Sequence, residues 1–224
     1  YNKSFGGNEM IKGVIFDLDG VLVSTDEMHY QAWKRLADQL GIFGFTRKDN
    51  ERQRGVSRMA SLEIVLEKTD RVYTEEEKVK LAEKKNDYYK ELLQKLDDGA
   101  VLKGAKETLA KLREMGVLIG VGSVSKNTPM ILEKTGLLPY IDKVSCGLDI
   151  TKSKPDPEVF LVAAKKLGLP AEECLVVEDA AAGIQAAKAA GMKSLAVGPY
   201  YEKLGATYQA PGLYAVNDWK EMLG

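Results

Sequence analysis

The sequence predicts an α/β fold, a doubly wound parallel sheet into which a smaller helical domain is inserted. Three observations predict it. The run Val14–Phe16 is apolar without alternation, as in a parallel strand that is covered on both faces. From about Gly104 onward, further short apolar runs alternate with helical patterns. Between Ser24 and about Asp97 the strand signal is absent, and apolar residues recur at helical spacing instead.

Apolar runs mark the strands, whereas prolines and glycines mark the helices between them. The expected strands are Val14–Phe16, Leu118–Val121, Lys143–Ser145, Leu175–Val177 and Leu195–Val197. Pro129 and Pro157 suit the first turn of a helix, where the amide hydrogen that proline lacks is not needed. The helices should end at Gly116, Gly136, Gly168 and Gly191.

The inserted segment carries two helix-start patterns. Ser24 with Glu27 forms a capping box, which predicts a helix with one apolar face as far as Gly41. Thr74 with Glu77 forms a second box and predicts a long charged helix to about Lys95. We therefore expect a helical cap at residues 24–97, an α/β core at residues 10–23 and 98–224, and a disordered leader or cloning remnant at residues 1–9. A domain hinged beside a strand end is well placed to act as a lid.

Composition limits the partners of the chain. Its 32 basic and 33 acidic side chains give a formal net charge of −1, so no global field attracts nucleic acid or a membrane. Cys146 and Cys174 form no CxxC pattern, and no signal peptide or long apolar span is evident, which indicates a reducing compartment. We expect a cytoplasmic monomer that acts on a small molecule.

Two carboxylates follow the first expected strand. In an extended chain the side chains of Asp17 and Asp19 point the same way, and Gly20 then turns the chain. Two anions at one site need a cation, a shared proton or an electrophile between them. An EF-hand loop is excluded because Leu22 and Met28 stand where it needs glycine and glutamate. A solvated turn remains the alternative.

Polar groups also follow the later strands. Ser123, Ser125, Lys126 and Asn127 come after the strand that ends at Val121. Lys154 is framed by prolines in a loop ahead of a helix, a setting that suits an anion-binding lysine. Glu178 and Asp179 end another buried strand, and such hard oxygen ligands suit Mg²⁺.

These residues carry a family resemblance. In order and context, Asp17, Asp19, Ser123, Lys154, Glu178 and Asp179 match the motif set of the haloacid dehalogenase superfamily, whose core is Rossmann-like. The chain resembles the superfamily from Met10 onward. The inserted segment is similar to the cap of its β-phosphoglucomutase family at His29, Ala32, Trp33, Arg54 to Arg58, Ser61, Leu62 and Lys84 to Asn86. Ser24 and Arg54 stand where that family commonly has aspartate and lysine.

The resemblance implies a Mg²⁺-dependent phosphotransferase that interconverts β-glucose 1-phosphate and glucose 6-phosphate through a phosphoaspartate and a 1,6-bisphosphate. Asp17 would be the nucleophile and Asp19 the general acid and base, with Ser123 and Lys154 neutralising the phosphoryl group. The implied metal ligands are Asp17, the backbone carbonyl of Asp19, Glu178 and Asp179. The implied substrate-binding residues are His29, Trp33, Arg54, Gly55, Arg58, Ser61, Lys85, Ser125, Lys126 and Asn127, among which Arg58 would hold the distal phosphate.

Two other functions and one structural alternative stay open. A sugar-phosphate phosphatase of the same superfamily would use the same core acids, so only the cap separates the two activities. A noncatalytic sugar-phosphate sensor is the alternative from another class, because a fold does not fix a function. His29 shares a helix face with apolar Trp33 and Leu36, so it could also be a core residue.

Overall fold

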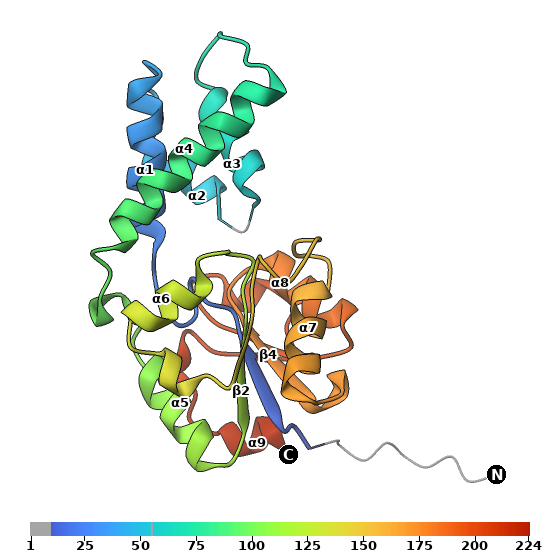
Figure 1. The fold of residues 1–224 in the computed structure, drawn as a ribbon. Helices are drawn as coiled ribbons and strands as arrows, with labels where there is room; N and C mark the ends of the chain where they lie inside the picture. The colour runs from blue at the N-terminus through green and yellow to red at the C-terminus, as the bar shows by residue number, and fades with distance from the viewer. Residues whose placement is uncertain (1–9, 55) are drawn as a thin grey trace, which may run out of the picture. The chain divides into compact units, whose positions relative to one another are not determined.

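The strands of the protein form one parallel sheet. A computed structural model describes residues 10–54 and 56–224, so the expectation for residues 1–9 lies outside the described residues. Within these ranges the sheet has six strands in the order β3-β2-β1-β4-β5-β6, and every neighbouring pair is parallel (Figure 1). The strands are β1 (Gly13–Phe16), β2 (Leu118–Gly122), β3 (Lys143–Ser145), β4 (Cys174–Glu178), β5 (Lys193–Ala196) and β6 (Tyr208–Gln209). The predicted α/β class is confirmed; β6 is too short to give an apolar run and was not expected.

The register of the central strands places their carboxyl ends side by side. Phe16 of β1 is level with Val121 of β2 on one side and with Val177 of β4 on the other. The residues that follow these three positions therefore emerge at the same edge of the sheet. Ligands of open α/β sheets bind at this edge.

Helices cover both faces of the sheet. Figure 1 shows α5 and α6 on one side of the strands and α7 and α8 on the other. The bounds are α5 (Ala105–Glu114), α6 (Thr128–Lys134), α7 (Glu158–Leu167), α8 (Ala181–Ala189) and α9 (Trp219–Leu223). Short 3₁₀ turns occupy Asp98–Ala100, Leu138–Tyr140, Ala171–Glu173, Tyr201–Lys203 and Leu213–Ala215. Ile15, Val176 and Phe160 belong to the apolar core beneath α7 and α8.

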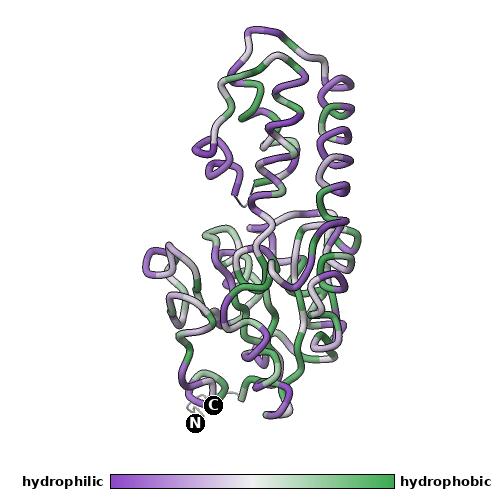
Figure 2. Tube along the Cα trace, turned by 90° about the vertical axis from the view of Figure 1, so that its left-hand side faces the viewer, coloured by the Kyte–Doolittle hydropathy of each residue, from purple (hydrophilic) through white to green (hydrophobic). Residues whose placement is uncertain are grey.

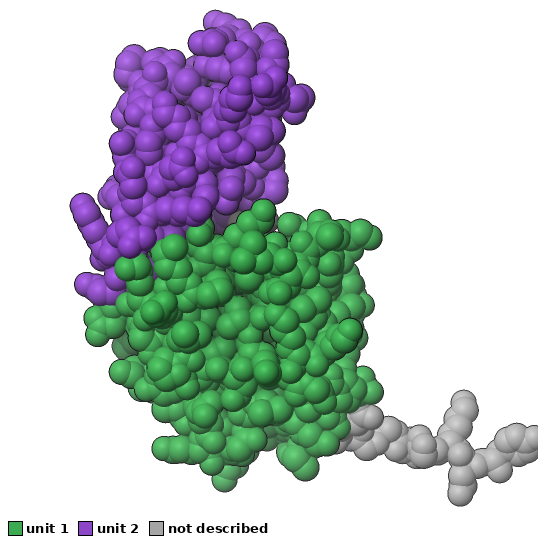
Figure 3. Space-filling model, in the orientation of Figure 1, with its two compact units in different colours: residues 1–24, 98–224 green, residues 25–97 purple. Residues whose placement is uncertain are grey.

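The chain divides into two compact units (Figure 3). The chain up to Ser24 together with Asp98–Gly224 forms unit 1, and Thr25–Asp97 forms unit 2. Unit 2 contains α1 (Asp26–Gln39), α2 (Arg47–Arg52), α3 (Arg58–Leu66) and α4 (Glu75–Leu93). Hydrophilic residues predominate along these helices (Figure 2), and the apolar faces of α1 and α4 pack together. No helix in the described ranges is long and apolar enough to cross a membrane.

One of the two predicted capping boxes is confirmed and the other is wrong. Thr74 Oγ1 accepts from the backbone amide of Glu77 at 3.1 Å, and the Glu77 carboxylate accepts from the Thr74 amide at 2.8 Å. Ser24 does not cap α1, which begins at Asp26 after Thr25. Both groups of this expected capping box are bonded to residues distant in sequence. The Ser24 amide donates to the Ala100 carbonyl at 2.9 Å instead of to Glu27. The Glu27 carboxylate accepts from two nitrogens of Arg47.

Candidate active site

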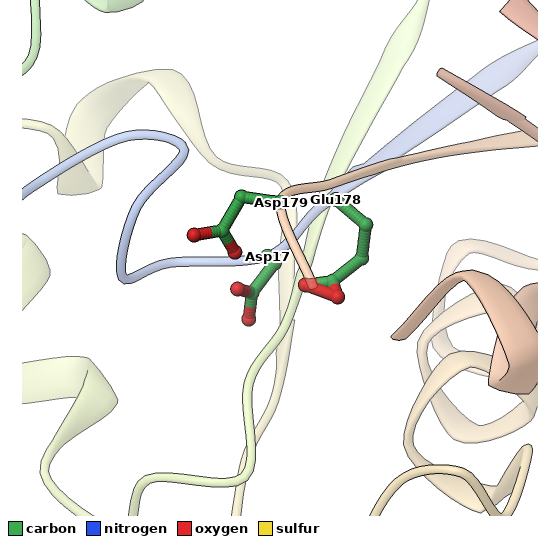
Figure 4. A group of neighbouring side chains, drawn as sticks. All are labelled: Asp17, Glu178 and Asp179. Atoms are coloured by element: carbon green, nitrogen blue, oxygen red, sulfur yellow. The ribbon is translucent and has the colours of Figure 1, made fainter. Parts of the chain in front are cut away.

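Three acids meet at the carboxyl edge of the sheet. Asp17 follows β1, Glu178 is the last residue of β4, and Asp179 comes directly after it. Each offers a carboxylate oxygen, and these oxygens lie within 4.8 Å of one another (Figure 4). The backbone continues the strand pairing at this point, since the Asp17 amide donates to the Val177 carbonyl at 2.9 Å. Two neighbouring strands thus bring the acids together, as the sequence predicts.

Two glycines make room for the acidic side chains. A Cβ atom on Gly183 would lie 1.4 Å from Oε2 of Glu178, and one on Gly20 would lie 1.9 Å from Oδ2 of Asp179. Gly20 also has a φ of +81°, which strains any other residue. Any side chain at either position would therefore push a carboxylate out of the cluster.

Lys154 supplies the positive charge within this cluster. Its Nζ atom lies 2.9 Å from Oδ1 of Asp17 and 3.4 Å from Oε1 of Glu178. It also donates to the Gly122 carbonyl at 3.2 Å. Burial acts to lower the pKa of Lys154, but the carboxylates of Asp17 and Glu178 outweigh it and raise that pKa above its ordinary value. Lys154 therefore stays charged at neutral pH.

The acids fit a divalent cation. Glu178 is 1% exposed, and its Oε2 atom has no hydrogen-bond partner among the described residues. Burial, together with the nearby Asp17 carboxylate, raises the pKa of Glu178 well above its ordinary value. Lys154 alone does not offset this effect, so a further cation is needed to keep all three carboxylates ionised. A buried carboxylate oxygen without a partner, within reach of two others, is a suitable ligand for a hard divalent metal.

Asp19 follows Asp17 by two residues, but its carboxylate does not belong to the group of three. The chain bends at Leu18, so the extended geometry that predicted parallel side chains for Asp17 and Asp19 does not continue to Asp19. The Leu18 carbonyl instead accepts from the amides of Leu22 and Val23, which closes a tight loop around Asp19. Metal binding through the Asp19 backbone carbonyl, and its role as acid and base, stay predictions.

The loop after β2 brings the predicted hydroxyls together. Ser123 is buried, its amide donates to the Ser145 carbonyl at 3.0 Å, and its Oγ accepts from the Ser125 amide at 3.3 Å. Oγ of Ser125 accepts in turn from the amide of Asn127 at 3.2 Å. Lys126 is exposed. These bonds hold the Ser123–Asn127 loop in one conformation at the end of β2.

Four predicted or neighbouring side chains cluster inside unit 2. Lys85 Nζ lies 2.9 Å from Nδ1 of His29, and its ammonium stands 4.7 Å from the ring centroid of Trp33. The ring of Tyr89 stacks on that of His29 with centroids 4.0 Å apart. Lys85 is only 4% exposed. Burial and the charges of Lys85 and Arg58 lower the pKa of His29 well below its ordinary value.

The other predicted substrate-binding residues of unit 2 differ from one another in burial and in their partners. Arg58 is exposed and donates to Oδ1 of Asn86 at 3.0 Å. Ser61 is buried at the start of α3. The guanidinium of Arg54 pairs with Asp26 through one nitrogen, so a substrate contact from Arg54 would use its other N–H groups. Gly55 lies outside the described residues.

Comparison with known proteins agrees with this geometry. Residues 11–191 match the family described as haloacid dehalogenase-like hydrolase, which is more than half of the chain. The chain belongs to that family.

Relatives of this haloacid dehalogenase-like hydrolase include sugar-phosphate enzymes. It is 40% identical over 198 residues to a Bacillus subtilis protein named beta-phosphoglucomutase, covering 88% of this chain and 87% of the relative. It is 31% identical over 194 residues to an Escherichia coli fructose-1-phosphate phosphatase, covering 84% of this chain and 97% of that protein. A crystal structure of beta-phosphoglucomutase from Clostridium difficile has a TM-score of 0.82 and 38% identity, with 92% of each chain covered.

The structure of this haloacid dehalogenase-like hydrolase adds residues that the sequence did not reveal. Phe160 lies beneath the Lys154 ammonium, 4.8 Å from the ring centroid to Nζ. Tyr89 stacks on His29 and donates from its hydroxyl to Thr25 Oγ1 at 3.2 Å. The sequence could have indicated Tyr89 only through its spacing, because a residue four positions after Lys85 lies on the same face of a helix. Gly183 follows the predicted ligand Glu178 by five residues, and only the structure shows that this glycine makes room for the Glu178 carboxylate.

Proposed function

We propose that this haloacid dehalogenase-like protein is a Mg²⁺-dependent β-phosphoglucomutase. It converts β-glucose 1-phosphate into glucose 6-phosphate through a phosphoaspartate at Asp17 and a 1,6-bisphosphate. The observation that carries the proposal is the extent of its likeness to the B. subtilis protein of that name. The aligned length exceeds unit 1 alone, so the likeness includes residues of unit 2, where mutases and phosphatases of this family are expected to differ.

The core residues support phosphoryl transfer to Asp17. Lys154 would hold the Asp17 carboxylate in position and neutralise charge on the incoming phosphoryl group, and Ser123 would donate to the same group. Asp17, Glu178 and Asp179 would hold Mg²⁺, whose charge when bound further neutralises the phosphoryl oxygens. A carboxylate is a weak nucleophile, so this concentration of positive charge is what makes its attack effective.

Asp19 would move the proton. It would protonate the sugar oxygen that leaves when Asp17 is phosphorylated, and it would deprotonate the sugar hydroxyl that attacks phospho-Asp17. A mutase needs both directions in one cycle. The tight loop around Asp19, closed by hydrogen bonds to the Leu18 carbonyl, supports this role because it fixes the backbone of Asp19 two residues after Asp17.

We further propose that unit 2 acts as the cap that recognises the second phosphate. Arg58 would bind that phosphate, and Ser125, Lys126 and Asn127 of unit 1 would contribute to its binding. His29 and Lys85 would recognise the sugar. The hydrogen bond from Arg58 to Asn86 supports its part of the proposal, because it orients the guanidinium at the cost of only one of its five N–H groups.

A sugar-phosphate phosphatase is the second candidate function. The likeness to the E. coli fructose-1-phosphate phosphatase favours it, and water would then replace the sugar hydroxyl in the second step. A noncatalytic sensor is disfavoured, since a binding protein has no need of a lysine held between two carboxylates. A monomeric, cytoplasmic protein stays a prediction that size-exclusion chromatography and cell fractionation would test.

Product analysis separates the candidates. The protein is incubated with β-glucose 1-phosphate, Mg²⁺ and a trace of glucose 1,6-bisphosphate, and glucose 6-phosphate and free phosphate are measured together. The mutase proposal expects glucose 6-phosphate in large excess over phosphate. The α anomer of glucose 1-phosphate and the Asp17→Asn variant are the controls, and neither should give product. Free phosphate as the main product would establish the phosphatase, and the absence of both products would favour the sensor.

A further inference from the structure

A pocket lies in unit 1 along one face of α5. It has a volume of about 320 Å³ and is lined by four residues of the α5 region, Gly104, Glu107, Thr108 and Lys111. Their spacing of three and four residues puts them on one side of the helix. The opposite wall comes from residues 213–219, including Tyr214 and Trp219. This volume is within the range of small-molecule sites, about 300–1,000 Å³.

Two glycines hold the aromatic wall of this pocket in place. A Cβ atom on Gly104 would lie 2.4 Å from the backbone nitrogen of Tyr214, and one on Gly212 would lie 2.5 Å from Cε1 of its ring. Lys103 covers the same ring, with Nζ 5.1 Å from the centroid. The Tyr214 ring therefore contacts Gly212 and the Lys103 ammonium group. Tyr214 is 54% exposed and offers a flat surface at the pocket.

Thr108, Lys103 and Lys111 offer donors to this pocket that no acid or carbonyl occupies in the described ranges. Thr108 is 5% exposed, lines the pocket, and makes no side-chain hydrogen bond to any residue in the described ranges. Lys103 and Lys111 form no ion pair within the same ranges, and Glu107 is the single acid lining the pocket. The Thr108 hydroxyl is not among the fully buried atoms without a partner, so it can be reached from the pocket. An accessible hydroxyl donor beside two lysines and one acid has the character of an anion site.

We propose that this pocket binds a small organic anion with a flat apolar body. The body would lie against the exposed Tyr214 ring beside Val216, and the acidic group would face Lys103 and Lys111. Thr108 would donate its hydroxyl hydrogen to the same group. The proposal concerns a site separate from the acidic cluster and does not depend on the proposed mutase activity.

The test uses naphthalene-2-sulfonate as the probe and the full chain as the protein, with heat of binding measured by titration calorimetry. We expect saturable binding of one probe molecule per chain. Naphthalene-2-methanol lacks the charge and inorganic sulfate lacks the apolar body, so each should bind at least about tenfold more weakly. Equal binding of the neutral alcohol would overturn the assignment of an anion, and the absence of saturable binding would overturn the site.

Substitutions locate the probe. The K103Q/K111Q double variant removes both charges and should weaken binding by about tenfold or more. Thr108→Val keeps the shape of the side chain and should weaken it several-fold. Lys106→Gln is the matched control, because Lys106 is an exposed lysine of the same helix that does not line the pocket. Both lysines of the double variant are exposed, so folding should be retained, as circular dichroism would show. Unchanged binding by the double variant would place the probe elsewhere and refute the proposal.

Discussion

The Nζ atom of Lys85 lies 2.9 Å from Nδ1 of His29 inside unit 2. An ammonium group can only donate, so Nδ1 accepts, and the neutral imidazole carries its hydrogen on Nε2. The tautomer of His29 therefore follows from its hydrogen bond with Lys85. His29 is a half-buried, hydrogen-bonded member of a cation–aromatic cluster with Trp33 and Tyr89, rather than an isolated core histidine.

We expect His29 to stay neutral well below the pH at which an exposed histidine titrates, because burial and the charges of Lys85 and Arg58 lower its pKa. The sequence contains a single histidine, so its ¹⁵N resonances need no assignment by mutagenesis. They should report a protonated Nε2 at pH 7. The unfolded chain binds a proton at this residue below about pH 6.5 and the folded chain does not. The free energy of unfolding should therefore fall as the pH drops from about 6.5 toward the folded-state pKa.

Lys85→Met is the control for this prediction. It removes the donated hydrogen bond and the nearby charge while keeping an unbranched side chain of similar length. The pKa of His29 should then rise toward its ordinary value, and the loss of stability below about pH 6.5 should become smaller. A His29 resonance that titrates near 6.5 in the unsubstituted protein would contradict the cluster geometry.

The Asp17→Asn and Asp19→Asn variants should lose different steps of the reaction. Asp17→Asn removes the proposed nucleophile and one carboxylate of the metal cluster, so no phosphoenzyme should form from acetyl phosphate. Asp19→Asn should still accept phosphate from that donor, whose leaving group needs no proton, yet lose sugar turnover. Radiolabelled acetyl phosphate with acid quenching measures both. Label retained by Asp17→Asn would refute the nucleophile, and equal loss of labelling in both variants would mean that Asp19 serves mainly as a metal ligand.

The core of this site could be predicted from the sequence because the rules that place it are topological. Carboxyl ends of parallel strands meet at one edge, so acids after two apolar runs had to converge, as Asp17 and Glu178 do. Lys154, which the sequence predicts to bind an anion, lies 2.9 Å from Asp17 although 137 residues separate them. Its loop could be recognised by its prolines, whereas its distance from the acids could not.

Other features depend on contacts that no local pattern encodes. The Ser24 capping box failed because Arg47, distant in sequence, occupies the Glu27 carboxylate. The stack of Tyr89 on His29 depends on how α1 packs against α4, which helical periodicity leaves undetermined. The bend at Leu18 likewise changes the direction of Asp19 without any proline or glycine at the bend itself.

Gly183→Ala should weaken Mg²⁺ binding although it replaces no charged residue. The new Cβ would lie 1.4 Å from Oε2 of Glu178, so the carboxylate has to leave its place beside Asp17 and Asp179. Displacing one ligand of such a site should weaken binding by at least about tenfold, as measured by calorimetric titration with MgCl₂. Gly44→Ala is the matched control, because its Cβ would meet only the Lys68 side chain at 3.7 Å.

Glu178→Gln serves as the second variant should Gly183→Ala prove unstable. It keeps the side-chain volume and removes the charge, so it should also weaken Mg²⁺ binding. Full Mg²⁺ affinity in both folded variants would mean that Glu178 is not a ligand and that its buried carboxylate has another role.

Arg58→Ala tests the proposed recognition of a second phosphate. Charge-assisted hydrogen bonds contribute on the order of 1.5–3 kcal/mol each, so loss of the guanidinium should lower kcat/KM for β-glucose 1-phosphate by at least about tenfold. Labelling of Asp17 by acetyl phosphate should change little, because this donor has no second phosphate. Arg52→Ala is the matched control, since Arg52 is an exposed arginine of unit 2 that pairs with Glu67.

The ratio of phosphoryl transfer to hydrolysis, measured on the phosphoenzyme, tests the role of Arg58 more directly. Binding energy from the distal phosphate is expected to favour transfer to the sugar and to exclude water from phospho-Asp17. Without Arg58, hydrolysis should therefore gain relative to transfer, and the ratio of glucose 6-phosphate to free phosphate should fall. The partial pairing of Arg58 with Asn86 predicts a smaller change in the same direction for Asn86→Ala, because that variant frees the guanidinium without removing it. An unchanged ratio in Arg58→Ala would leave the mutase without a residue for its second phosphate, and a simple phosphatase would then account better for the site.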